Sequence, residues 1–223
     1  MKDVPLPSFE RNPKFADAGR ELTSLEDSYN PLTFNNFYEF GFSKDEPARN
    51  AKEYKIDPYA LEIDGLVAEP KKLDLDDIEK LGIEERVYRF RCVEAWAMTV
   101  PWLGVPLKKI LEQVEIKPEA KYVAFQTHAD EEVMPGLRVK SYAWPYREGL
   151  RLDEAMNDLT MAVTGMYGKR LLPQSGTPMR IITPWKYGYK GAKSVVKMTL
   201  TAEQPPTLWN IAIPNEYKFY SNV

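Results

Sequence analysis

Cysteine and histidine are the scarcest reactive side chains in this sequence, with one of each among 223 residues. A single thiol, Cys92, cannot form an internal disulfide, so a disulfide-stabilised scaffold is excluded. A single histidine, His128, excludes zinc sites built from several His or Cys ligands. A Ser-His-Asp triad would have to use His128, and no nucleophile-elbow motif supports one. At a strand end, such a residue is more often a surface or hydrogen-bonding side chain than a catalyst.

Other absences narrow the function further. No run of about 18 apolar residues is present, so no membrane-spanning helix is predicted. A polar, proline-rich segment follows Met1, and no export signal is visible in this chain. The formal net charge of −3 argues against nucleic acid as the partner of the whole chain. Neither a Walker loop nor a dinucleotide-binding fingerprint occurs.

Proline and aromatic residues are abundant, with 18 prolines, 13 tyrosines, 9 phenylalanines and 5 tryptophans. This composition favours many short strands and ordered loops over a helical bundle. We therefore predict a mixed, β-rich α+β fold. Residues 1–33 show no sustained period and are predicted to form an extended arm, followed by a single domain over 34–223.

Periodicity and turn signals place the expected elements within that domain. We expect a hairpin at 59–70 that turns at Asp64-Gly65, and a short helix at 73–82 capped by Asp74 or Asp76. The best helical pattern covers 104–116, with Pro106 in its first turn. Further strands are expected at 87–92, 121–128, 159–172, 179–184 and 193–203, and a loop with one helical turn at 141–158.

Cys92 stands in the run RFRCVEAWAMTVPW, after Arg89 and Arg91 and two residues before Glu94. Strand alternation places its side chain on the core-facing row, at a strand end. A neighbouring cation favours the thiolate, which is the form that binds metals and attacks electrophiles. The alternative is a structural buried thiol, because free cysteine is among the most buried residue types.

A basic run extends from Arg180 to Lys193 without any acidic residue, in an otherwise acidic chain. Its cations are Arg180, Lys186, Lys190 and Lys193. Gly188 and Gly191 let backbone N–H groups approach a ligand closely. Arginine forks and lysine charges suit a bound phosphate. The alternatives are a solvated surface loop and, ranked low because of the net charge, a stacking site for nucleic acid.

The segment NNFYEFGF at 35–42 combines aromatic and amide side chains, which suits a loop packed into a site. Together, the thiol, the basic run and this loop indicate a soft or high-valent transition metal. With one protein ligand, the other ligands must come from a cofactor. The pattern therefore predicts a metal carried by an organic, phosphorylated ligand.

Six motifs in register, NNFYEFG, RCVEAWAMTVPW, KYVAFQT, EGLRLDEAM, WKYGYKGAKS and PNEYKFYSNV, carry a resemblance to a known family. From about residue 33 onwards, the chain resembles the catalytic subunits of periplasmic protein-methionine-sulfoxide reductases. These belong to the sulfite oxidase class of molybdenum enzymes. The resemblance implies a sulfite-oxidase-type molybdopterin-binding domain of mixed sheets with short helices.

In that family, one molybdopterin dithiolene and one cysteine bind the molybdenum, and the matching cysteine is Cys92. The resemblance implies that the cofactor is held by Asn35, Tyr38, Glu39, Thr127, Ser175, Arg180, Gly191, Ala192 and Lys193. Ser175 departs from the asparagine common in the family, so one contact is expected to be lost or bridged by water. His128 replaces an expected apolar residue. Relatives continue beyond the point matching Val223, so the chain is expected to be shortened at this end.

The resemblance implies reduction of methionine sulfoxide in oxidised periplasmic proteins. It also implies twin-arginine export, a periplasmic location and electrons from a haem-containing membrane subunit. A carboxylate at Glu94 would repel sulfite but not a neutral sulfoxide. Glu94 is therefore a candidate catalytic residue that relays protons or hydrogen-bonds near the metal, unless it pairs with Arg89 or Arg91. Trp96 and Trp102 could line the pocket or simply pack in the core.

Two other functions stay open on the sequence. One is a related reductase of small S- or N-oxides. The other is a cofactor-free anion-binding module that retains only the fold, which the departure at Ser175 and the short C-terminal end would favour.

Overall fold

Two β-sheets organise residues 5–223, the part of the chain that this computed structural model describes. One sheet has the order β1-β4-β5-β8-β10, with β9 paired to β8. Its strands are β1 (Glu10–Arg11), β4 (Glu84–Arg91), β5 (Ala97–Pro106), β8 (Met161–Met166), β9 (Lys169–Arg170) and β10 (Arg180–Ile182). The other has the order β3-β2-β11-β6-β7. Its strands are β2 (Leu61–Gly65), β3 (Lys71–Leu73), β6 (Tyr122–Thr127), β7 (Arg147–Arg151) and β11 (Val195–Thr201).

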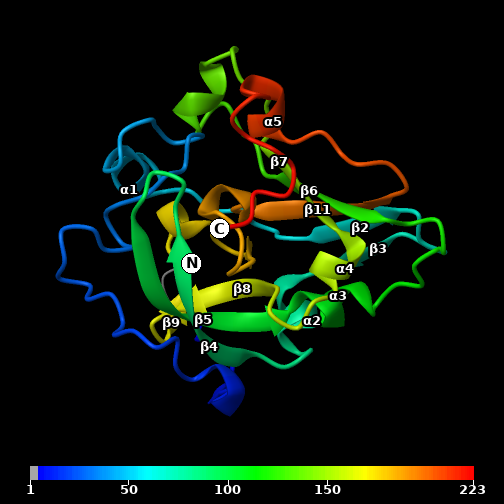
Figure 1. The fold of residues 1–223 in the computed structure, drawn as a ribbon, viewed down its shortest axis with the longest axis horizontal. Helices are drawn as coiled ribbons and strands as arrows, with labels where there is room; N and C mark the ends of the chain where they lie inside the picture. Colours follow the sequence, from blue (N-terminus) through cyan, green and yellow to red (C-terminus); the bar gives the residue numbers. More distant parts are fainter. Residues whose placement is uncertain (1–4) are drawn as a thin grey trace.

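The helices are short and lie at the ends of the sheets (Figure 1). They are α1 (Glu46–Asn50), α2 (Leu75–Glu79), α3 (Leu107–Leu111), α4 (Leu152–Ala155) and α5 (Leu208–Ala212). The described residues also contain four 3₁₀ turns: η1 (Pro13–Phe15), η2 (Pro135–Arg138), η3 (Pro173–Ser175) and η4 (Gly188–Lys190). The predicted β-rich α+β class, with mixed sheets and short helices, is confirmed. None of the helices described is long and apolar enough to cross a membrane.

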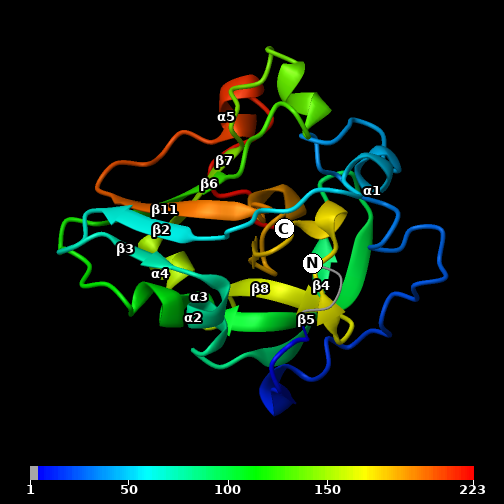
Figure 2. The same ribbon diagram turned by 180° about the vertical axis from the view of Figure 1, so that it is seen from behind.

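The largest apolar cluster is built from both sheets. It joins Ile63 of β2 and Phe125 of β6 to Val105 of β5 and Ile181 of β10. Figure 2 shows β11 and β2 running above β8 and β5, with α2 and α3 at one end. Each of these four side chains is fully buried, so burial of apolar area on both inner faces holds the layers together.

The N-terminal segment lies along the six-stranded sheet. Strand β1 pairs in parallel with the start of β4, and the Thr23 amide donates to the Thr99 carbonyl of β5 at 2.9 Å. Phe15, Leu32 and Phe34 pack on a second apolar cluster that contains Met98 and Trp102. Residues 5–33 therefore run across the sheet that carries Cys92.

Several predicted elements are present with shifted bounds. A hairpin forms here, because β2 and β3 pair antiparallel, but its second strand, Lys71–Leu73, lies beyond the predicted range 59–70. Its turn follows Gly65, which stays in β2 at a φ of +84° beside the backbone of Leu200. Helix α2 begins after Asp74, whose side chain accepts from the Asp77 amide in a capping box.

The predicted helix over 104–116 is wrong in its first part. Gly104, Val105 and Pro106 continue β5, and α3 occupies only Leu107–Leu111. Gly104 has a strand role, because a Cβ there would lie 2.2 Å from the Ala162 carbonyl oxygen of neighbouring β8. Contacts between strands override the local helical pattern.

Strands β4 and β5 form one long antiparallel hairpin that rises at one side of the molecule (Figure 1). Its last pair is Arg91 with Ala97, and the Cys92 amide donates to the Trp96 carbonyl at 2.9 Å. Cys92 therefore lies at a strand end, as predicted, at the entry to the hairpin tip.

Candidate active site around Cys92

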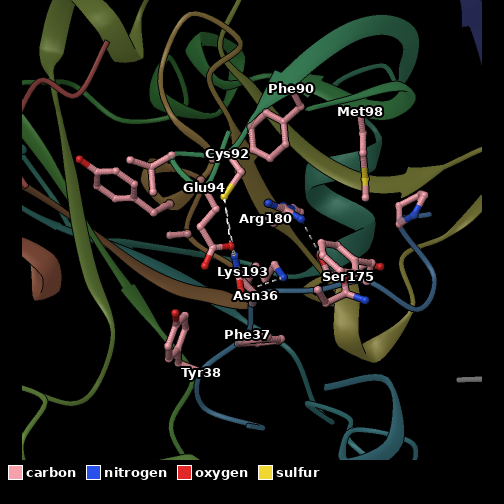
Figure 3. A pocket seen from close by; sticks show the side chains of 18 of the residues that line it. Asn36, Phe37, Tyr38, Phe90, Cys92, Glu94, Met98, Ser175, Arg180 and Lys193 are labelled. Carbon is pink, nitrogen blue, oxygen red and sulfur yellow. Dashed lines mark hydrogen bonds between the residues drawn. The ribbon is translucent and has the colours of Figure 1, made fainter. Parts of the chain in front are cut away.

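A pocket opens beside the tip of the β4–β5 hairpin (Figure 3). Its walls come from segments far apart in the sequence: the 35–39 loop, the hairpin tip, η3, the start of β10, the 188–193 segment and α5. Most of the predicted site residues line it: Asn35, Tyr38, Glu39, Cys92, Glu94, Ser175, Arg180, Gly191, Ala192 and Lys193. Trp96 and Trp102 line it too.

Cys92 is 9% exposed within this pocket. Burial raises the pKa of its thiol, and the nearby Glu94 charge acts in the same direction. The positive charge that lowers the pKa of Cys92 comes from Lys44, so the predicted role of Arg89 and Arg91 is wrong. Arg89 is exposed on the opposite face of β4.

Glu94 lies at the centre of a hydrogen-bonded cluster at the pocket mouth. Its carboxylate is 2.8 Å from the Lys44 ammonium and accepts from Asn36 Nδ2 at 2.9 Å and from Trp96 Nε1 at 3.3 Å. Burial raises the pKa of Glu94, but these donors outweigh it and leave the pKa below its ordinary value. Glu94 is therefore a carboxylate at neutral pH, and its partner is Lys44, not Arg89 or Arg91.

Asn36 and Lys44 are two members of this cluster that sequence reasoning missed. Asn36 Nδ2 lies 3.7 Å from the Cys92 sulfur, and Lys44 Nζ donates to Asn36 Oδ1 at 2.5 Å. Asn36 falls inside the NNFYEFGF segment, which predicted a loop packed into the site. Nothing local marks Lys44, because only the folded chain places it across from the hairpin tip.

Arg180 also lines the pocket and is buried. Its guanidinium stacks 5.3 Å from the Trp102 ring, and Nη1 donates to the Ser175 carbonyl at 3.2 Å. Burial lowers the pKa of Arg180 to about 10, so it remains charged at neutral pH. Within residues 5–223 it forms no salt bridge, and its Nε has no hydrogen-bond partner.

Two further polar groups of the pocket wall also lack a hydrogen-bond partner in the described part of the chain. Ser175 Oγ and Asn35 Nδ2 are buried without a partner among the described residues. Buried polar atoms are normally hydrogen-bonded, since leaving one unpaired costs about 1–3 kcal/mol. With Arg180, they give the pocket wall positive charge and unsatisfied polar atoms, which suit an anionic, polar ligand.

The 191–193 segment closes tightly over Arg180. A Cβ at Gly191 would lie 2.7 Å from the Ile181 carbonyl and 3.4 Å from Arg180 Nη2, so only glycine fits there without displacement. Lys193 Nζ donates to the Asn36 carbonyl at 2.7 Å and to the Gln174 carbonyl at 3.2 Å. Burial, followed by the Arg180 charge, lowers the pKa of Lys193 well below its ordinary value.

The prediction that Lys186 and Lys190 belong to a phosphate-binding site is wrong. Lys186 points away from the pocket and pairs with Glu154 at 2.6 Å, while donating to the Tyr220 carbonyl at 2.8 Å. Lys190 forms a fully buried pair with Glu148. Both cations are therefore occupied by structural partners, and of the four cations in the basic run only Arg180 and Lys193 line the pocket.

Glu39 and Thr127 meet below the pocket floor. Glu39 is 3% exposed, and Thr127 Oγ1 donates to its Oε1 at 3.5 Å. Burial raises the pKa of Glu39 to about 7. Thr127 also donates to the Tyr146 carbonyl at 3.3 Å, so it lies behind Glu39. His128 contacts the Tyr54 hydroxyl at 3.3 Å and has a hydrogen-bonding role.

Aromatic side chains form the outer wall. Tyr38 packs edge-on against Phe42 and Trp209, and Trp209 stacks on Tyr217. Phe42 and Val93 are each about two-fifths exposed beside the opening. Within residues 5–223, no group of three or more His, Cys, Asp or Glu side chains could hold a metal ion by itself.

Comparisons with known proteins identify the family of the chain. Residues 48–209 match the family model described as the oxidoreductase molybdopterin-binding domain. The chain is 51% identical over 213 residues to the protein-methionine-sulfoxide reductase catalytic subunit MsrP of Burkholderia mallei. That match covers 95% of this chain and 63% of the relative, so the chain spans less than two thirds of the relative's length.

A solved structure supports the fold. The sulfane dehydrogenase SoxCD of Paracoccus pantotrophus superposes with a TM-score of 0.58 over 82% of this chain and 51% of that chain. At 18% sequence identity, this likeness concerns the arrangement of the two sheets and not the reaction.

Proposed function

Because the chain belongs to the family of oxidoreductases with a molybdopterin-binding domain, we propose that it reduces methionine sulfoxide in proteins. Cys92 would be the protein ligand of the molybdenum, which is bound to one molybdopterin. The observation that carries the proposal is one buried thiol in a pocket that also contains a buried arginine without a salt-bridge partner among the described residues.

The residues present fit the cofactor. Arg180 Nε, Ser175 Oγ and Asn35 Nδ2 are buried and unpartnered, and an anionic group with several acceptor atoms would satisfy them. Lys193 has used two of its three donors on backbone carbonyls and keeps one for a ligand. Because Gly191 has no side chain, its backbone lies close to Arg180 and could contact the same ligand. Tyr38, Glu39, Ala192 and, from behind Glu39, Thr127 would complete the cradle.

When bound, the molybdenum centre would supply the two electrons and accept the oxygen atom. The overall reaction is balanced by two protons: sulfoxide, two electrons and two protons give thioether and water. Glu94 would accept a proton from solvent and deliver it to the substrate, because its carboxylate is 39% exposed at the pocket mouth. The side-chain amide of Asn36 would direct its N–H groups toward the Cys92 sulfur.

The charge at the pocket mouth suits an uncharged substrate. Glu94 and Lys44 form a pair at 2.8 Å with no net charge, so neither an anion nor a cation is strongly attracted. The exposed rim at Phe42 and Val93, beside Tyr38 and Trp209, offers apolar and aromatic contacts to a methionine side chain. The substrates would be oxidised proteins of the periplasm.

The electron donor would be a haem-containing membrane subunit, and the chain would reach the periplasm by twin-arginine export. The name of the B. mallei relative supports a partner, because it denotes a catalytic subunit.

The test uses protein produced in a host that makes molybdopterin, with reduced viologen as electron donor. A methionine-rich protein oxidised by peroxide should be reduced with a higher kcat/KM than free methionine sulfoxide. Cys92→Ser should abolish both activities, and Lys108→Met, outside the pocket, should leave them unchanged. Reduction of small N-oxides without any sulfoxide reduction would contradict the proposal. Anion binding that survives Cys92→Ser, without any reductase activity, would indicate a binding module.

A further inference from the structure

Lys44 lies between the aromatic loop and α1, and its ammonium reaches into the cluster beside Cys92. Nζ is 2.8 Å from the Glu94 carboxylate and 2.5 Å from Asn36 Oδ1. The side chain is 28% exposed, so its stem is largely covered. Lys44 does not touch the Cys92 sulfur, and it can act on that atom only through a neighbour or through its charge.

The ammonium of Lys44 determines which way the Asn36 amide faces. An ammonium has only donors, so the atom of Asn36 that contacts it must be the acceptor, Oδ1. The opposite atom, Nδ2, is then directed to Glu94 Oε2 at 2.9 Å and to Cys92 Sγ at 3.7 Å. In the flipped orientation, Oδ1 would face the Glu94 carboxylate, which only accepts hydrogen bonds.

The backbone around Asn36 is already fixed on both sides. Lys193 Nζ donates to the Asn36 carbonyl at 2.7 Å, and the Asn35 amide donates to the Lys44 carbonyl at 2.9 Å. The remaining freedom of Asn36 is therefore rotation of its side chain, and the ammonium of Lys44 restricts it. Figure 3 shows Asn36 beside Lys193 and below Cys92 and Glu94.

We propose that Lys44 is a positioning residue of the active site, which orients the Asn36 amide so that its N–H groups face Glu94 and the Cys92 sulfur. The importance of that orientation for turnover rests on the proposed function, whereas the orientation itself does not. A group displaced or rotated at a reacting centre lowers turnover even when it is remote from the bond that breaks.

The first test reads the orientation in the cofactor-free protein. The side-chain amide of ¹⁵N-labelled Asn36, assigned by comparison with Asn36→Ala, should show a rigid heteronuclear NOE in the wild type. Lys44→Met should make this amide mobile, and Lys44→Arg should keep it rigid. Lys108→Met is the matched control, because Lys108 is similarly covered at 35% exposure and pairs with Asp158 at 3.0 Å. If Lys44→Met does not fold, Lys44→Ala is read in the same way. A rigid Asn36 amide in the variant would overturn the proposal.

The second test is a double-mutant cycle in the cofactor-loaded enzyme. Lys44→Met should lower kcat about tenfold with little change in KM, and Lys44→Arg should restore most of it. In the Asn36→Ala background, Lys44→Met should change kcat by less than about twofold, because the orienting residue has nothing left to orient. A full tenfold loss in that background would overturn the proposal. If no sulfoxide is reduced at all, the proposed function fails, and the NMR result still decides the role of Lys44.

Discussion

At the scale of single residues, the pocket contains more buried positive charge than the protein itself neutralises. Arg180 and Lys193 lie near each other, and burial lowers the pKa of each side chain. Lys193 at least donates to two carbonyls, whereas Arg180 has a single carbonyl partner within residues 5–223. Burying a charge without a counter-charge is unfavourable. The folded chain tolerates that cost at a place where an anionic ligand would remove it.

This imbalance predicts opposite effects of Arg180→Met on stability and on cofactor content. Without cofactor, the free energy of unfolding of the variant should be at least about 1 kcal/mol higher than that of the wild type, because an uncompensated buried charge is removed. With cofactor supplied, its molybdopterin content should fall severalfold. Urea unfolding and pterin fluorescence measure the two effects. A cofactor-free variant that is strongly destabilised would show that Arg180 has structural partners instead.

Glu39 predicts a pH dependence of stability in the cofactor-free chain. Its pKa is about 7 in the folded state, against an ordinary value of 4.5. Between these values the folded state binds more protons than the unfolded state, so the free energy of unfolding decreases as the pH rises. The stability is fully present below about pH 4.5 and is lost as the pH passes 7. The decrease should reach up to about 3 kcal/mol.

The measurement is urea unfolding between pH 5 and pH 8. Glu39→Gln should remove most of this slope, since it keeps the hydrogen-bonding shape without the charge. Glu203→Gln, at an exposed carboxyl, is the control and should keep it. An equal slope in wild type and Glu39→Gln would refute the assignment.

Single residues also show where sequence reasoning is sufficient. Cys92 could be predicted as a pocket thiol because strand alternation and the strand end determine its position. Lys44 and Asn36 could not be predicted as its neighbours, because their contacts to the hairpin tip span 50 and 56 positions in the sequence. Local patterns contain no information on such contacts.

At the scale of elements, the lysines of the basic run have two different roles. Lys193 lines the pocket, whereas Lys186 and Lys190 form ion pairs outside it. Lys186 and Lys190 project to the five-stranded sheet and to residues 219–222, where Lys190 lies 4.4 Å over the Phe219 ring. Their partners Glu148 and Glu154 come from β7 and α4. The run looked like a single cradle because the sequence does not show where the chain turns at η4.

The buried Lys190–Glu148 pair predicts a non-additive effect on stability. Lys190→Met should cost about 3–5 kcal/mol, since it leaves the Glu148 charge buried and unpaired. Adding Glu148→Leu should recover most of that loss. Urea denaturation of both singles and the double variant gives the coupling energy. Additive losses in the double variant would mean that the two side chains contribute independently.

Strand β5 shows that a local helix signal can be wrong. Residues 97–106 include Pro101 and Pro106, and Pro106 suggests a helix start. In the structure, β5 lies between β4 and β8 and pairs with both. Ladder pairing on both sides is a tertiary effect, and it extends the strand up to the first residue of α3. The β-rich class could be predicted from the spacing of turns and strands, but this register could not.

At the scale of the whole molecule, the pocket is built from strands of the six-stranded sheet, from the loops around them and from α5. The β4–β5 hairpin brings the thiol, β10 with the 188–193 segment brings the positive charge, and the 35–39 loop closes the floor. The chain matches the molybdopterin-binding family over residues 48–209, a span that includes Cys92 and Arg180. The 35–39 loop lies outside that span, and the structure shows that it belongs to the same pocket.

The most direct test of the central claim is the molybdenum and pterin content of purified protein from a cofactor-competent host. Elemental analysis and pterin fluorescence should give about one of each per chain in the wild type. Cys92→Ser should lose the molybdenum, while Lys108→Met should retain both components. A wild-type chain that contains neither molybdenum nor pterin would contradict the account and leave Cys92 as a buried structural thiol.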